Sequence, residues 1–259
     1  MSAITAPPQR SARRGHRPTR SRWNRSAFAR NAARLLPWPT VTPVATAMVL
    51  LLLTAALLLR THPGDVGTVV AWASTNQHNL AHHPAAAMLV SMFVVTGNLL
   101  PELLVVAISF AVLERAVGAL RTAVIALTGQ VVATLLTEYG ADLGARLHLL
   151  AASSAERPDV GVSYVMYAVL AAGVLLLVGR ARLIGLLAVG VCVLVPFLIA
   201  PGMTSTGHVL AVTVGATTMA LIQRRAHRRD RRVPGWSSSP SQLSIVAFPA
   251  DDHRRLPSR

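Results

Sequence analysis

The sequence predicts an all-α, polytopic membrane protein, a six-helix bundle with both termini on the cytoplasmic side. Of its 259 residues, 53% are hydrophobic and only 14% are charged, about half the charged share of an ordinary soluble domain. The mean hydropathy of +0.49 agrees with that composition. The apolar residues also fall into separate segments, each close to the ~20 residues that cross a bilayer as a helix.

Most of the charge lies in two tails. All 25 basic residues are arginines, and nine of them precede residue 35 while nine follow residue 223. We therefore divide the chain into a disordered basic cytoplasmic tail, a six-helix transmembrane domain and a second disordered basic cytoplasmic tail, over residues 1–40, 41–223 and 224–259. Such tails orient a protein and contact anionic lipid headgroups. We expect the lipid bilayer as a partner and no nucleic acid, because the tails contain no recognisable nucleic-acid-binding module.

Six apolar segments are predicted to span the membrane. Between the first two we expect a partly embedded loop over residues 61–84, with Trp72 as an interfacial anchor, and then a short embedded helix over residues 85–96. The six predicted spans cover residues 43–60, 98–113, 121–136, 161–178, 183–199 and 207–222.

The arginines in the connecting segments orient these spans, because cytoplasmic loops are enriched in basic residues. With the N-terminal tail inside, one inside loop carries Arg115 and the other carries Arg180 and Arg182. The outside segments contain Arg60 at a helix end and two further arginines, Arg146 and Arg157. The last two are offset by neighbouring acidic residues, which are Glu138, Asp142, Glu156 and Asp159. The chain is thus predicted to be a multi-pass protein of the cell membrane with both termini in the cytoplasm.

Two polar residues in the predicted spans have chemistry that fits together. Ser163 enters the fourth span and His208 enters the sixth span, both from the outside and at similar depth, given the ~1.5 Å rise per helical residue. Alone, Ser163 is typical of a helix cap and His208 of an interfacial histidine. Together they predict a dyad, because neutral imidazole can take the proton of a serine hydroxyl. Ala211 and Gly215 lie one and two turns below His208 and would allow close helix approach.

Three motifs resemble those of the rhomboid intramembrane serine proteases. In that family the fourth helix begins with Gly-x-Ser-Gly and has a tyrosine four residues after the serine, which GVSYVMYA matches through Gly161, Ser163 and Tyr167. The sixth-helix pattern is Ala-His-x-x-Gly-x-x-x-Gly, of which GHVLAVTVG supplies His208 and Gly215, with Ala211 as the small residue between them. The second-helix pattern Glu-Arg-x-x-Gly is matched by LERAVG. The resemblance covers residues 43–223. It implies a rhomboid-like six-helix core with Ser163 as nucleophile, His208 as general base and Tyr167 as the ring that orients the imidazole.

The sequence departs from the family pattern at two places. Tyr164 replaces the second glycine, so a bulky ring next to the nucleophile is expected to narrow the substrate cleft. Asn98 and Glu102 occupy the positions of the family's His-x-x-x-Asn pair and are the oxyanion candidates. Asn98 can donate from its amide, whereas Glu102 donates only when protonated, which apolar surroundings favour.

From these features we predict a rhomboid-like intramembrane serine endopeptidase that hydrolyses peptide bonds of transmembrane protein substrates without a metal or cofactor. The alternative is a catalytically weak or inactive rhomboid-like membrane protein that binds transmembrane helices. A more distant alternative is an unrelated six-helix transporter with Glu102 as a proton site. The histidines of the first loop lack a paired carboxylate, so no metal site is predicted there.

Overall fold

The computed structural model describes residues 37–95, 97–148 and 158–230. Most of the two segments predicted to be disordered tails lies outside these residues. Within the described residues every regular element is a helix and there is no strand. The all-α class predicted from the sequence is therefore confirmed.

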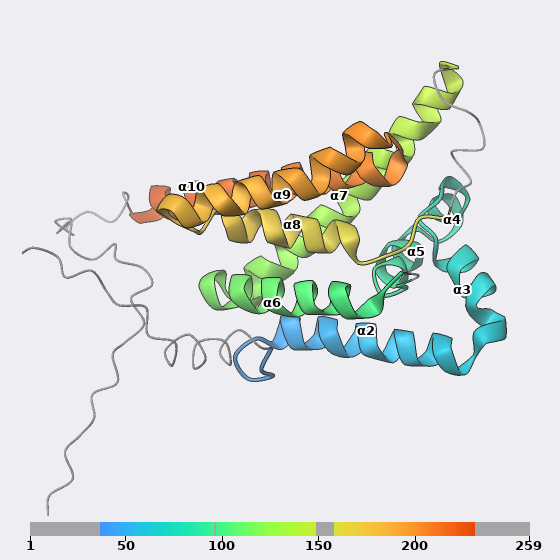
Figure 1. The fold of residues 1–259 in the computed structure, drawn as a ribbon, viewed down its shortest axis with the longest axis horizontal. Coiled ribbons are helices and arrows are strands. Elements are labelled where there is room, and N and C mark those ends of the chain that lie inside the picture. The colour runs from blue at the N-terminus through green and yellow to red at the C-terminus, as the bar shows by residue number, and fades with distance from the viewer. Residues whose placement is uncertain (1–36, 96, 149–157, 231–259) are drawn as a thin grey trace, which may run out of the picture.

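Helices α2 (Pro43–Thr61) and α6 (Leu99–Val117) lie side by side along one edge of the bundle (Figure 1). The bounds of α2 agree closely with the predicted first span, and a proline at a first helical position has the φ angle that a helix needs. The first turn of α2 is capped by α6. The backbone N–H groups of Val44 and Ala45 donate to the two carboxylate oxygens of Glu114, at 3.0 and 2.8 Å.

The segment between α2 and α6 is folded into short helices at one end of the bundle (Figure 1). The side-chain amide of Asn79 holds this region together by donating to the carbonyls of Ala71, Trp72 and Ser74 at 2.7, 3.1 and 2.8 Å. The last of these helices overlaps the short helix predicted over residues 85–96, but it ends at Ser91. The elements are η1 (Pro63–Asp65), α3 (Val66–Ala73), α4 (Gln77–His82) and α5 (Pro84–Ser91).

Helix α7 (Ala119–Arg146) is longer than predicted. Its apolar part ends near Leu136, but the helix continues for ten more residues, and its end projects past the rest of the bundle (Figure 1). The added segment contains no proline, and Asp142 pairs with Arg146 one turn later at 2.8 Å. Such i, i+4 pairs support helices in polar sequence, so the expected loop after residue 136 is helical to Arg146.

The last three helices are α8 (Ser163–Val174), α9 (Gly179–Ile199) and α10 (Met203–Asp230). Helix α8 is shorter than the predicted span because Gly161 has a φ of +138°, a value that an α-helix cannot contain. A non-helical turn then follows Val174. Helix α10 extends beyond the predicted span at both ends and continues into the arginine-rich sequence after residue 222.

Helix α8 lies at the centre of the bundle and packs against α6, α7, α9 and α10. Its contact with α10 is close at Gly215, where a Cβ atom would collide with the backbone of Ala168. Ala211, one turn earlier on α10, is fully buried. The close approach predicted from these small residues is confirmed. Helix α9 is the least buried of the four long apolar helices, with Val193 its one buried residue.

Four of the described helices, α2, α7, α9 and α10, are long and apolar enough to cross a membrane. The α6 sequence contains Glu102, Glu114 and Arg115, and α8 has only 12 residues. The chain is therefore a multi-pass helical membrane protein. The start of α2 and the end of α10 lie at the same end of the bundle (Figure 1).

Candidate active site

The segment that leads into α8 is fixed against the short helices of the first loop. The backbone N–H of Thr75 donates to the Asp159 carbonyl at 2.9 Å, and the Asp159 N–H donates to Ser74 Oγ at 2.9 Å. The Gly161 N–H donates to the Ser91 carbonyl at 2.8 Å. These bonds, with the helix start that follows Gly161, determine where Ser163 lies.

Ser163 is the first residue of α8 and is half-buried. Its side chain lines a cavity of only about 10 Å³, which Ser91 and Gln130 also line. Gln130 Nε2 donates to Ser91 Oγ at 3.3 Å and to the Met88 carbonyl at 3.4 Å, while Gln130 Oε1 is buried with no partner in the described residues. The candidate nucleophile therefore lies in a small polar space between α5, α7 and α8.

His208 lies on α10 beside the first turns of α8. Its ring contacts Tyr167, with 4.6 Å between ring centroids and an interplanar angle of 44°. It also contacts Tyr164 edge to face, with centroids 5.9 Å apart. Within the part of the chain that the structure describes, the buried Nε2 atom of His208 has no hydrogen-bond partner. A tyrosine thus fixes the imidazole while one of its nitrogens stays unpaired.

Tyr164 turns its ring into the contact between α8 and α10, and only 4% of the residue is exposed. The ring lies against Gly207, where a Cβ atom would overlap it. The Tyr164 hydroxyl donates to Asp159 Oδ2 at 3.0 Å. A bulky residue next to Ser163 is thus accommodated because position 207 carries no side chain.

Ser163 and His208 lie on packed neighbouring helices, but no hydrogen bond joins them in the described structure. The two residues line different cavities, and Asp159 lines both. The predicted pair therefore lies at the same end of the α8–α10 contact, and its two residues line separate spaces.

The two oxyanion candidates lie at the start of α6. Asn98 is the N-cap residue, but its exposed side chain makes no capping hydrogen bond. Glu102 is half-buried, with Oε1 beside Gly97. The structure thus places both candidates at the N-terminal end of α6, with Glu102 the more buried of the two.

A second and larger cavity, of about 490 Å³, opens between the end of α7, the end of α9 and the start of α10. It is lined by His208 and by two carboxylates, Glu138 and Asp159. Burial raises the pKa of Asp159 above its ordinary value, while hydrogen bonds from Tyr164 and Thr75 act in the opposite direction. The cavity thus places acidic groups beside the imidazole.

Sequence reasoning assigned Glu138 and Asp159 only to a polar outside loop. One signal could have identified Glu138, because Gln130, Thr134 and Glu138 follow each other at intervals of four and so share one face of a helix. All three are buried in α7. The end of apolar sequence at Leu136 hid this pattern, since it suggested that the helix ended there.

The histidines of the first loop contact aromatic neighbours. The rings of His78 and His82 are 4.3 Å apart, and His83 stacks on Trp72 at 5.2 Å. Trp72 itself is half exposed. Among the described residues, no group of three histidine, cysteine or acidic side chains is arranged to hold a metal ion.

The fold and the site define a class, a multi-pass helical membrane protein with a serine at the start of its central helix and a histidine beside it on a neighbouring helix. The family model described as "Rhomboid-like protein" matches residues 42–228. The chain belongs to the rhomboid-like protein family, and the family predicted from the motifs is confirmed. Searches of curated proteins and of solved structures found no match.

Proposed function

We propose that this chain is a rhomboid-like intramembrane serine endopeptidase that hydrolyses peptide bonds of transmembrane protein substrates. The proposal is carried by the buried Nε2 of His208, which has no hydrogen-bond partner among the residues that the structure describes. The imidazole lies against the ring of Tyr167, beside the helix that begins at Ser163. An imidazole nitrogen with no partner is free to accept the proton of a hydroxyl.

In this mechanism Ser163 Oγ attacks the scissile carbonyl carbon and His208 Nε2 takes the hydroxyl proton. The tetrahedral intermediate then collapses, the carbon–nitrogen bond breaks, and the imidazolium gives its proton to the departing amine. Water, deprotonated by His208, hydrolyses the serine ester and restores the free hydroxyl. Catalysis requires Oγ and Nε2 to come within about 3.2 Å, and such contacts tighten when substrate binds.

Asn98 and Glu102 are the proposed oxyanion donors, through an amide and a protonated carboxyl group. Both come from the N-terminal end of α6, and the positive end of that helix dipole would favour the negative charge of the oxyanion. Removing one oxyanion donor in a serine protease lowers kcat by roughly 10²–10³-fold, so each donor can be tested separately.

We further propose six crossings of the cell membrane with both termini in the cytoplasm. The start of α2, the α6–α7 turn, the start of α9 and the end of α10 gather at one end of the bundle (Figure 1). The arginines of the connecting segments, Arg115, Arg121, Arg180 and Arg182, belong to these elements. A basic end is the expected cytoplasmic end, and the site of Ser163 lies at the opposite one.

The proposal is tested with a fluorescent serine-directed phosphonate probe on the purified protein in detergent. Labelling is expected in the wild type and should be lost in Ser163→Ala. It should also be lost in His208→Ala, because the hydroxyl is weakly nucleophilic without its base. Ser91→Ala is the matched control, since Ser91 lines the same small cavity and should leave labelling unchanged. Equal labelling of wild type and Ser163→Ala would contradict the proposal.

A further inference from the structure

The larger cavity contains a feature that the proposed chemistry does not use. Only 1% of Glu138 is exposed, yet neither of its carboxylate oxygens has a hydrogen-bond partner in the described residues. Burying a carboxyl group without a partner is costly. An unpartnered carboxyl group that lines a cavity therefore indicates a binding site for a group that donates hydrogen bonds to it.

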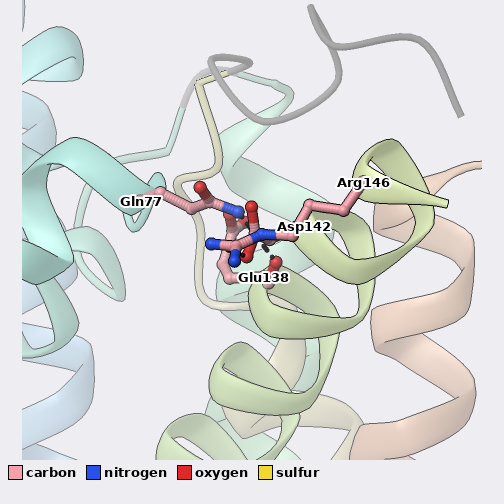
Figure 2. A network of polar contacts seen from close by, with 4 residues as sticks. All are labelled: Gln77, Glu138, Asp142 and Arg146. Atoms are coloured by element: carbon pink, nitrogen blue, oxygen red, sulfur yellow. Dashed lines mark hydrogen bonds and ion pairs between the residues drawn. The ribbon is translucent and has the colours of Figure 1, made fainter. Parts of the chain in front are cut away.

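Among the described residues, the neighbours of Glu138 do not supply that donor (Figure 2). Gln77 Nε2 donates at 3.2 Å to the backbone carbonyl of Glu138 and not to its carboxylate. Arg146 is exposed and pairs with Asp142 at 2.8 Å. The second acid, Asp159, already accepts hydrogen bonds at Oδ2 from Tyr164 and Thr75, at 3.0 and 3.3 Å. Of the two acids that line the cavity, Glu138 is therefore the one whose carboxylate has no partner in the described part of the chain.

We propose that the cavity binds the basic side chain of a lysine or arginine in the bound transmembrane substrate, with Glu138 as its main counter-ion and Asp159 as a second acidic group. An ammonium or guanidinium group both donates hydrogen bonds and carries the charge opposite to two carboxylates. The remaining walls suit an aliphatic stem, because Val195, Pro196, Ile199 and Met203 are apolar. The volume of about 490 Å³ falls within the range of roughly 300–1,000 Å³ that is usual for ligand sites.

The occupant is assigned to the substrate because the same cavity is lined by His208, the general base of the proposed function, on which this inference rests. A basic side chain in the cavity would lie next to the proposed base and hence near the scissile bond. The chain would then prefer substrates with lysine or arginine close to the cleavage site.

Binding is measured separately from hydrolysis, in the Ser163→Ala background. The protein is placed in phosphatidylcholine nanodiscs and titrated with a labelled polyleucine transmembrane peptide. One lysine is moved through successive positions of its outer flank, and a parallel series carries norleucine instead. At one or two adjacent positions the lysine peptide is expected to bind about tenfold more tightly than its norleucine counterpart, the scale of one charged hydrogen bond.

Glu138→Gln should remove that lysine preference, because glutamine retains size and polarity but carries no charge. Asp142→Asn is the matched control, since it removes an acid one turn later on the same helix outside the cavity, and it should retain the preference. Thermal unfolding checks that each variant is folded, and Asp159→Asn, which should weaken the preference, serves as a second variant. Equal binding of both peptide series, or a preference that persists in Glu138→Gln, would overturn the assignment.

A lipid headgroup could supply the same ammonium chemistry. If phosphatidylethanolamine in the nanodiscs abolishes the lysine preference, the cavity binds that headgroup and the assignment to substrate fails. A preference that persists with this lipid present supports the assignment. Probe labelling of the wild type separates the two hypotheses. If lysine is preferred but the probe does not label the protein, the cation site is supported and the protease proposal is contradicted. If the probe labels the protein but lysine is not preferred, the protease proposal is supported and the cation site is contradicted.

Discussion

The hydroxyl of Tyr164 donates a hydrogen bond to the Asp159 carboxylate, five residues earlier, at 3.0 Å. The bond joins the first turn of α8 to the segment that fixes that helix against the first loop. Tyr164→Phe should lower the free energy of unfolding by about 1–3 kcal/mol, because a buried acceptor loses its donor. Thermal unfolding in detergent measures this. Tyr139→Phe, at an exposed position of α7, should change stability by less than about 0.5 kcal/mol, and equal effects of the two would contradict the role of the bond.

Asp159 should also make stability depend on pH. Burial raises its pKa above the ordinary value of 3.8, so the folded protein retains this proton to higher pH than the unfolded chain does. Between the two pKa values the folded state binds more protons, and stability falls as pH rises through that window. In Asp159→Asn this fall should be smaller, so the variant gains stability relative to wild type as pH increases from below 3.8 to neutral.

The midpoint of thermal unfolding of wild type and Asp159→Asn, measured across that pH range, tests whether the variant gains stability relative to wild type as pH rises. The comparison is repeated in the Glu138→Gln background, so that the second acid of the cavity does not contribute. A variant that instead loses stability relative to wild type as pH rises would show that Asp159 is stabilised in its charged form.

Gly215 should tolerate no side chain. A Cβ atom there would collide with the backbone of Ala168, so Gly215→Ala must separate α10 from α8 at a cost of about 1–3 kcal/mol. Gly190→Ala on α9 is the matched control, because no other atom lies within 4 Å of a Cβ at that position. Alanine in a helix is favoured over glycine, so this variant should be as stable as wild type or more so. If Gly215→Ala unfolds at a higher temperature than Gly190→Ala, the close contact at Gly215 is refuted.

Glu114 should be required for the first turn of α2. Glu114→Ala leaves the N–H groups of Val44 and Ala45 without their acceptor, at a cost of about 1–3 kcal/mol for each group left buried. Glu114→Gln retains one acceptor oxygen and should lose less stability. If the two variants unfold at the same temperature, the carboxylate does not act as a cap.

Tyr167 should position His208 and not take part in the chemistry directly. Tyr167→Phe keeps the ring that contacts the imidazole and should label with the serine probe at close to the wild-type rate. Tyr167→Ala removes the ring and should slow labelling by up to about 10²-fold, the scale of a misplaced catalytic group. A larger loss in the phenylalanine variant than in the alanine variant would assign the role to the hydroxyl instead.

Several elements could be predicted from sequence because local signals determine them. The bounds of α2 follow from an apolar run between Pro43 and Arg60. The short α5 and the positions of Ser163 and Tyr167 on one helix follow from similar patterns. The contact of Tyr167 with His208 is expected only through the family motifs, because residues on two different helices cannot be paired from local sequence patterns.

Other features depend on tertiary structure. The apolar sequence ends at Leu136, but the helix continues to Arg146, where Asp142 and Arg146 form an ion pair. Because of that extension, Glu138 and His208 line the same cavity. The pattern of a single segment cannot predict this, since the two residues come from different helices. The direction of the Tyr164 ring likewise depends on the missing side chain at Gly207, 43 residues later in the sequence.

The cap that Glu114 provides for α2 has a consequence for biosynthesis. Glu114 follows Val44 by 70 residues, so α2 leaves the ribosome long before its cap exists. Until α6 is made, the first N–H groups of α2 can be satisfied only by water or lipid headgroups, since the hydrocarbon core offers no acceptor. We therefore expect the first turn of α2 to contact water or lipid headgroups until α6 is present. Docking of α6 against α2 is then the step that supplies the carboxylate acceptor for the N–H groups of Val44 and Ala45.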